Sequence, residues 1–123
     1  MNAYCNAAGV GLLPWSPLCA GVLAHAWEDR TDPRETQDPF LKALFRANSF
    51  EADKSIVGRV EELAKKKSAS MAQIAVAWLI SKSCMPIMGL STKEQIDQAV
   101  GAASVSLNDE EVNTLKSRIC QRE

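Results

Sequence analysis

The 123-residue sequence is short of several residue types, and each shortage argues against a class of function. It has one histidine, so a zinc site would need an unusual set of ligands, and we expect no metal ion. Fourteen basic and fifteen acidic residues give no electrostatic reason to expect nucleic acid or an anionic membrane as partner. No apolar run approaches the roughly 18 residues that span a bilayer, and the first residues do not resemble a signal peptide. We therefore expect a soluble, cytoplasmic protein.

The four cysteines are Cys5, Cys19, Cys84 and Cys120, and no two of them form a C-x-x-C pair. In a chain with no sign of secretion, this spacing predicts free thiols rather than disulfides. The length allows one domain or less, and an apolar content of 46% is enough for a core.

Two short apolar runs, residues 9–18 and 85–91, each end in a special turn. Both are continuous in apolar residues rather than alternating, as in parallel strands that are covered on both faces. They predict strands at 10–13 and about 84–88, with Pro14 ending the ladder of the first. Each strand is expected to stop at a loop that faces a ligand.

The remaining segments predict helices by the spacing of their apolar residues. We expect them over residues 1–8, about 53–67, 70–80, 91–100 and 108–119, with a short helix from Pro39 inside a long loop at 19–52. The helix from Ser70 is apolar almost all round as far as Ile80, so it should be buried. The three lysines at 65–67 are interpreted as a solvated helix end.

Helix caps are predicted at three places. Ser70 with Gln73, and Ser91 with Glu94, match the capping-box pattern, in which each side chain bonds the other residue's backbone N–H. Asn108 with Glu111 shows a related cap.

The turn from Gly89 to Ser91 is the best candidate site on the residues alone. A strand that runs into a helix start presents free backbone amides and a positive helix end, which suit a phosphate. Ser91, Thr92, Lys93 and Gln95 supply further donors, although an ordinary capped helix remains the alternative.

The loop after the first strand offers a second element of a site. Trp15 is a flat aromatic able to stack on a planar ring, while Ser16 and the backbone of Leu18 can contact a diphosphate. For Trp15, a place in the core is the alternative.

Taken together, three blocks of sequence resemble the C-terminal part of an aldo-keto reductase. The blocks are Val10–Leu18, Ala72–Leu79 and Pro86–Ser91, and the tail from Ala99 to Glu111 also fits. The blocks occur in the family's order and together span nearly the whole chain. Within the family they most resemble reductases of the aryl-alcohol dehydrogenase and versiconal type. The resemblance implies an α/β fold that is a partial (β/α)8 TIM barrel, with the last two β/α units plus C-terminal helices. Residues 1–123 would then be a truncated barrel fragment that lacks the N-terminal half, from a shortened gene product or gene model.

The resemblance also implies an NADP(H) site. Trp15 would stack on the nicotinamide, Ser16 and Leu18 would contact the diphosphate, and the segment Gly89, Leu90, Ser91 and Thr92 would hold the adenosine 2′-phosphate. Lys93, Gln95 and Gln98 would complete it. The chain departs from the family at two positions, because Gln95 supplies no positive charge where many members carry Arg and Ala99 cannot hydrogen-bond adenine. Lys93 is the residue that would compensate.

The family's catalytic Asp, Tyr, Lys and His come from early strands that this chain does not contain. Tyr4 matches the end of the sixth helix and His25 lies in the loop after strand seven, so neither is carried over and no catalytic residue is named. The expected function is an oxidoreductase that interconverts a small-molecule carbonyl and an alcohol with NADP(H), here as an inactive cofactor-binding fragment. A non-catalytic remnant or module that pairs with a full-length reductase is the alternative, and a helical adaptor without a ligand is a weaker one. Because two strands are too few for an independent sheet, we also expect marginal stability and self-association through the open barrel edge.

Overall fold

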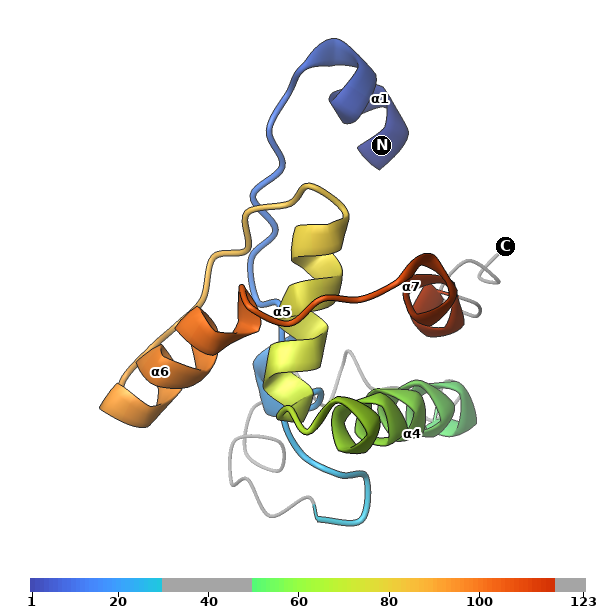
Figure 1. The fold of residues 1–123 in the computed structure, drawn as a ribbon, viewed down its shortest axis with the longest axis vertical. Coiled ribbons are helices and arrows are strands. Elements are labelled where there is room, and N and C mark those ends of the chain that lie inside the picture. The colour runs from blue at the N-terminus through green and yellow to red at the C-terminus, as the bar shows by residue number, and fades with distance from the viewer. Residues whose placement is uncertain (30–49, 117–123) are drawn as a thin grey trace.

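The computed structural model describes residues 1–29 and 50–116, in which helices dominate (Figure 1). The elements are α1 (Asn2–Ala8), a 3-10 turn η1 (Cys19–Gly21), α4 (Phe50–Lys67), α5 (Met71–Ser81), α6 (Lys93–Ala102) and α7 (Asp109–Lys116). Helix α5 stands at the centre, with α4 and α7 on one side, α6 on the other, and α1 at the far end of the molecule.

The helices predicted from apolar spacing are confirmed within these ranges. The predicted helix 53–67 begins earlier, at Phe50, so residues 50–52 belong to α4 and not to the long loop. The predicted N-terminal helix is α1, which ends at Gly9 in the left-handed conformation (φ 67°) that glycine adopts without strain. The predicted short helix from Pro39, the end of the last helix and Cys120 lie outside the described residues.

The two predicted strands do not form continuous strands within the described residues. The segments 10–15 and 84–88 are joined by two isolated parallel bridges, Leu12 to Cys84 and Trp15 to Ile87. Between these bridges a regular ladder needs an N–H on Pro14, and proline has none. Two neighbouring strands are also too few to stabilise a sheet. The partial-barrel detail of the predicted fold is therefore not confirmed.

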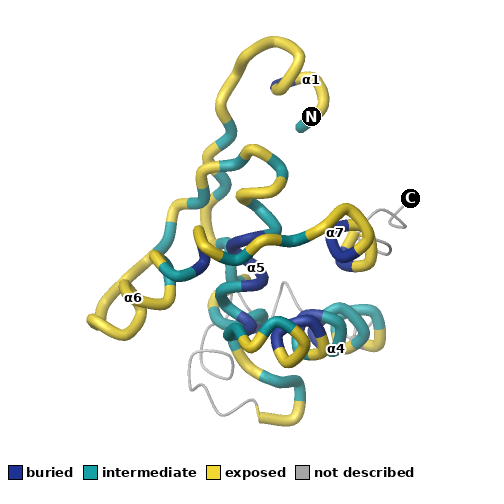
Figure 2. The backbone as a smooth tube through the Cα atoms, in the orientation of Figure 1, coloured by how far each residue is buried: buried dark blue, intermediate teal, exposed yellow. Residues whose placement is uncertain are grey.

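The core lies between α4, α5 and α7, as the buried residues in Figure 2 show. Val57 of α4 and Ile74 of α5 are almost fully buried, and Leu115 of α7 packs in the same cluster. Burial of a side chain of this size contributes about 1.5–3 kcal/mol. The three helices are therefore held together mainly by apolar contact.

Helix α5 is less buried than its sequence predicts. Met71 and Ile74 belong to the core, but Trp78 and Leu79 are half-buried and Ile80 is 43% exposed. The buried residues of α5 lie between Met71 and Ala77, and the core cluster takes Met71 and Ile74 from them. Trp78 has a structural contact, because its indole N–H donates to the carbonyl of Val112 in α7 at 3.1 Å.

Two of the three predicted caps are confirmed. Ser70 accepts from the Gln73 N–H at 3.2 Å and Gln73 accepts in return from the Ser70 N–H at 2.9 Å. Asn108 and Glu111 exchange the corresponding bonds at the start of α7, at 2.9 and 3.0 Å. The third prediction is wrong in register, since α6 is capped by Thr92 rather than by Ser91.

The lysine run at the end of α4 is not a simple solvated helix end. Lys67 lies 2.9 Å from one carboxylate oxygen of Glu111, Lys66 lies 3.5 Å from the other, and Lys67 also donates to the carbonyl of Ser106. The Glu111 side chain is only 7% exposed. These ion pairs connect the end of α4 to the start of α7.

Candidate functional site

The segments 10–15 and 84–88 run in parallel and end at the same side of the molecule. The carbonyl of Leu12 accepts from the Met85 N–H at 2.9 Å, and the carbonyl of Pro14 accepts from the Ile87 N–H at 2.8 Å. This register brings the loop that begins at Ser16 beside the loop that begins at Met88. Both loops then border one cavity.

That cavity has a volume of about 420 Å³ and collects residues from distant parts of the sequence. Six of the ten predicted site residues line it: Ser16, Leu18, Gly89, Leu90, Gln95 and Gln98. Ala72 and Val76 of α5 are also among its lining residues. The structure thus places most of the predicted site together, although their cofactor-binding roles remain predictions.

Trp15 is not part of the core, which excludes the alternative interpretation of this residue. It is 72% exposed and lines a second, mostly apolar cavity of about 250 Å³. This second cavity shares Ser16 and Pro17 with the first. Trp15 therefore stands beside the larger cavity and does not line it.

The backbone amides at the start of α6 were expected to be free, but two of them have partners. The side-chain oxygen of Gln95 accepts from the Ser91 N–H at 2.7 Å and from the Thr92 N–H at 3.3 Å. The Thr92 hydroxyl in turn accepts from the Gln95 N–H at 3.3 Å. Two of the amides expected to hold a phosphate are therefore occupied by the protein's own capping box.

The charges near this helix start also differ from the expectation. Lys93 pairs with Asp97 at 2.8 Å and does not line the cavity. Glu94 does line it, and hydrogen bonds from its own backbone N–H and from the Thr92 hydroxyl lower the pKa of its carboxyl group. Among the described residues that line the cavity, no lysine or arginine is present.

The loop from Ser16 to Gly21 has an unusual backbone. Ser16, Cys19 and Ala20 have φ values of 54°, 49° and 55°, in the left-handed region that L-residues rarely adopt. Each such residue costs about 1–2 kcal/mol, and strained residues of this kind cluster at functional sites. Partial desolvation, followed by the Asp53 carboxylate, raises the pKa of the Cys19 thiol above its ordinary value.

Sequence reasoning missed three features of the cavity wall. His25, the single histidine, lines the cavity from the loop after the first segment. Glu94 was expected to cap the helix, and Ala72 and Val76 were expected only in the core. The apolar pattern of α5 could have identified the last two, because a helix that is apolar all round also faces something on its second side.

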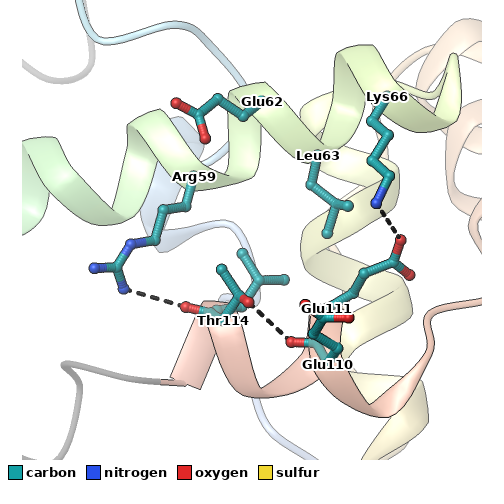
Figure 3. Close-up of a pocket in the computed structure, with 8 residues that line it drawn as sticks. Arg59, Glu62, Leu63, Lys66, Glu110, Glu111 and Thr114 are labelled. Carbon is teal, nitrogen blue, oxygen red and sulfur yellow. Dashed lines mark hydrogen bonds and ion pairs between the residues drawn. The ribbon is translucent and has the colours of Figure 1, made fainter.

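A smaller cleft of about 210 Å³ lies between α4 and α7 (Figure 3). Four of its polar side chains, those of Arg59, Lys66, Glu111 and Thr114, have partners within the protein. Arg59 donates to the carbonyl of Thr114 at 3.1 Å, and the Thr114 hydroxyl donates to the carbonyl of Glu110 at 2.9 Å. Lys66 points to Glu111 across the cleft. We interpret this cleft as part of the packing between the helices.

Neither a membrane-spanning helix nor a metal site is seen in the described ranges. In residues 1–29 and 50–116, no helix combines the length and apolar character needed to cross a membrane. In the same residues, no group of three or more His, Cys, Asp or Glu side chains is placed to hold a metal ion.

A larger cavity at the ends of two parallel segments, next to a helix start, is the arrangement found at the cofactor end of a (β/α)8 enzyme. Comparison with known families agrees, since residues 1–119 match the aldo/keto reductase family. The chain belongs to the aldo/keto reductase family, whose members are oxidoreductases with a (β/α)8 barrel. This confirms the resemblance inferred from the sequence.

Three relatives show how similar the chain is to individual members of the family and how much of each member it covers. The chain is 49% identical over 117 residues to the versiconal hemiacetal acetate reductase of Aspergillus parasiticus, covering 94% of this chain and 34% of that protein. It is 42% identical over 107 residues to a Saccharomyces cerevisiae protein named as an aryl-alcohol dehydrogenase, covering 87% of this chain and 31% of the relative. An aldo-keto reductase of Fusarium vanettenii is 35% identical over 122 residues, covering 99% of this chain and 33% of the relative. The chain thus spans about a third of the length of the curated relatives it matches.

Proposed function

We propose that this chain supplies the cofactor-binding part of an aldo-keto reductase that interconverts a carbonyl and an alcohol with a nicotinamide dinucleotide. The observation that supports it most is the cavity of about 420 Å³ that Ser16 and Leu18 share with Gly89 and Leu90. These residues lie more than seventy positions apart in the sequence. Their meeting around one cavity follows if both loops contact the same ligand.

The described residues suit the central part of a dinucleotide. Ser16 and the backbone near Leu18 offer hydrogen-bond donors for a diphosphate, and exposed Trp15 offers a flat face for the nicotinamide ring. Gln98 also lines the cavity, and its amide suits the edge of an adenine. When bound, the dinucleotide supplies hydride transfer; the protein residues bind and orient it.

The NADP(H) form of the cofactor remains a prediction. A 2′-phosphate at the start of α6 would have to displace Gln95 from the amides of Ser91 and Thr92. Once released, those two amides and the positive end of the helix would favour the phosphate. Lys93 is the next residue along the chain, and it would bind the phosphate if it left its ion pair with Asp97.

Binding of NADPH, followed by its fluorescence, tests the proposal. A Cβ atom added at Gly89, which lines the cavity, meets nothing within 4 Å, so Gly89→Leu adds bulk at the cavity wall. Gly58 on α4 also faces open space and lies outside the cavity, so Gly58→Leu is the matched control. We expect at least tenfold weaker binding for Gly89→Leu and unchanged binding for Gly58→Leu. Equal binding by both variants would place the dinucleotide elsewhere.

We propose further that the chain alone does not catalyse carbonyl reduction. General acid catalysis needs a positioned proton donor, and Tyr4 and His25 do not match the family's catalytic positions. NADPH binding without carbonyl-dependent NADPH oxidation is the expected result, and steady oxidation would contradict it. The alternative, a non-catalytic module that pairs with a full-length reductase, is favoured by the exposed apolar side chains of the segments 10–15 and 84–88. The predicted cytoplasmic location stays a prediction.

A further inference from the structure

Gln98, which lines the large cavity, carries two kinds of hydrogen-bonding group in one side chain. Its amide has an oxygen that accepts and a nitrogen that donates two protons. Rotation of the amide exchanges the two groups. The contacts that the amide makes with the rest of the protein therefore determine which group a ligand in the cavity meets.

Ser70 holds the oxygen of this amide. The Ser70 hydroxyl donates to the side-chain oxygen of Gln98 at 2.6 Å. This distance is typical of an O–H···O bond, whereas N–H···O bonds span about 2.7–3.2 Å, so the atom that faces Ser70 is the oxygen. The amide nitrogen of Gln98 is left for the cavity, and no partner is seen for it in the described part of the chain.

Ser70 is itself fixed in position by the capping box at the start of α5. Its hydroxyl oxygen accepts from the Gln73 N–H at 3.2 Å, and its own N–H donates to the Gln73 side-chain oxygen at 2.9 Å. The hydroxyl has a single proton, which goes to Gln98. The cap of α5 therefore also holds the donor that orients a side chain on α6.

The orientation of Gln98 limits what it can recognise in a purine. The edge of adenine that carries N7 presents this acceptor beside a donor, the 6-amino group, and a glutamine with a free oxygen pairs with both. With its oxygen bound to Ser70, Gln98 has only N–H donors to offer. Ala99, the next residue and also in the cavity wall, has no side-chain acceptor for the amino group. These two side chains therefore suit N7 and leave the 6-amino group without a partner.

We propose that Ser70 is a positioning residue that turns the donors of the Gln98 amide toward the purine, so that the site takes a 6-oxopurine as readily as adenine. The inference rests on the dinucleotide site proposed above. Hypoxanthine keeps N7 and has an oxygen in place of the 6-amino group. That oxygen is a second acceptor for the N–H groups of Gln98.

Two reduced dinucleotides test the proposal, namely NADPH and its analogue with hypoxanthine in place of adenine. Both carry the same nicotinamide, so fluorescence titration measures each dissociation constant in the same way. We expect the wild-type chain to bind the two within threefold of each other. A larger preference for NADPH would overturn the proposal, because another acceptor, such as the Glu94 carboxylate in the cavity wall, would then bind the 6-amino group.

Ser70→Asp reverses the arrangement and keeps the helix cap. Aspartate caps helices about as well as serine, but its carboxylate accepts from the Gln98 nitrogen and cannot donate to the oxygen. The oxygen of Gln98 then faces the 6-amino group, so this variant should prefer NADPH at least fivefold over the hypoxanthine form. An unchanged ratio would show that Ser70 does not orient Gln98.

Two further variants separate orientation from other effects of that substitution. Ser70→Thr keeps a hydroxyl group and should retain the wild-type ratio of the two dissociation constants. Ser104→Asp adds the same charge at an exposed position that does not line the cavity, and it should retain the ratio as well. A shift of the ratio in Ser104→Asp equal to that in Ser70→Asp would assign the effect to charge and overturn the positioning role.

The side-chain amide protons of Gln98 give a readout that needs no ligand. Their NMR signals should move downfield in Ser70→Asp, where they gain an acceptor, and stay in place in Ser104→Asp. Signals that do not move in Ser70→Asp would overturn the positioning role even where both dinucleotides bind. Binding of neither dinucleotide by the wild type would overturn the proposed function as well, whereas a strong preference for NADPH overturns this inference alone.

Discussion

The hydroxyl of Ser70 donates a hydrogen bond to the side-chain oxygen of Gln98 at 2.6 Å while it accepts another from the N–H of Gln73. Ser70 thus caps α5 and also connects this helix to α6. Gln98 lines the large cavity, so the bond orients a residue that faces the proposed ligand. Near the other end of α6, a side chain at Gly101 would come within 2.5 Å of the Gln73 amide, so glycine permits this close packing.

Loss of the Ser70 hydroxyl should destabilise the protein. Ser70→Ala removes the cap of α5 and the bond to Gln98, and we expect the free energy of unfolding to fall by about 1–2 kcal/mol. Urea denaturation followed by circular dichroism measures it. Ser104 is exposed to solvent and no side-chain hydrogen bond is seen for it within the described residues, so Ser104→Ala should change stability little. Equal effects of the two substitutions would show that the Ser70 contacts contribute nothing.

Glu111 should make stability depend on pH. The backbone N–H of Asn108, followed by Lys67, lowers the pKa of its carboxyl group in the folded protein. The stabilisation that the ionised Glu111 carboxylate gives to the folded protein is therefore complete above the ordinary glutamate pKa of about 4.3. It is lost as the pH falls through the lower pKa that this carboxyl group has in the folded state. The difference in unfolding free energy between wild type and Glu111→Gln should be largest near pH 7 and shrink below about pH 4. Glu110→Gln, a change on the exposed side of the same helix, is the control, and a difference that grows on acidification would contradict the assignment.

Replacing Ala20 by glycine should stabilise the folded protein, because the backbone at Ala20 is strained. Ala20 has φ 55° and ψ 32°, a conformation that glycine adopts without steric cost. Relief of about 1–2 kcal/mol of strain exceeds the entropy cost of glycine, which is about 0.4–1 kcal/mol. Ala20→Gly should therefore raise the free energy of unfolding by about 0.5–1 kcal/mol.

A nearby alanine provides the control for that substitution. Ala24 lies in the same loop region but is not among the described residues with positive φ. Ala24→Gly should lower stability, because glycine makes the unfolded chain more flexible and there is no backbone strain at this position for it to relieve. Thermal melts of the two variants should move in opposite directions, and a common direction would show that Ala20 is not strained.

Much of the helical structure could be predicted from the sequence because its signals are local. The Ser70–Gln73 and Asn108–Glu111 caps depend on residues three positions apart, and both are confirmed. The parallel approach of the segments 10–15 and 84–88 was predicted as well. The two segments do not form continuous strands, because Pro14 has no N–H to donate and two segments are too few to stabilise a sheet. The local apolar pattern therefore predicted more regular strand pairing than the structure contains.

The candidate site was harder to predict, because its details depend on competition between neighbours. Ser91 with Glu94 and Thr92 with Gln95 both match a capping box, and sequence alone does not decide between the two registers. The occupied amides and the pairing of Lys93 with Asp97 follow from the register that forms. The ion pairs of Lys66 and Lys67 with Glu111 join positions more than forty residues apart, which no local pattern shows.

The most direct test of the account is an NMR titration of the backbone amides with NADPH. We expect the amides of Leu18 and Gly89 to shift together along one binding curve, while amides in the cleft between α4 and α7, such as that of Thr114, do not move. Shifts confined to one loop, or centred on Thr114, would contradict a dinucleotide site built from both segments.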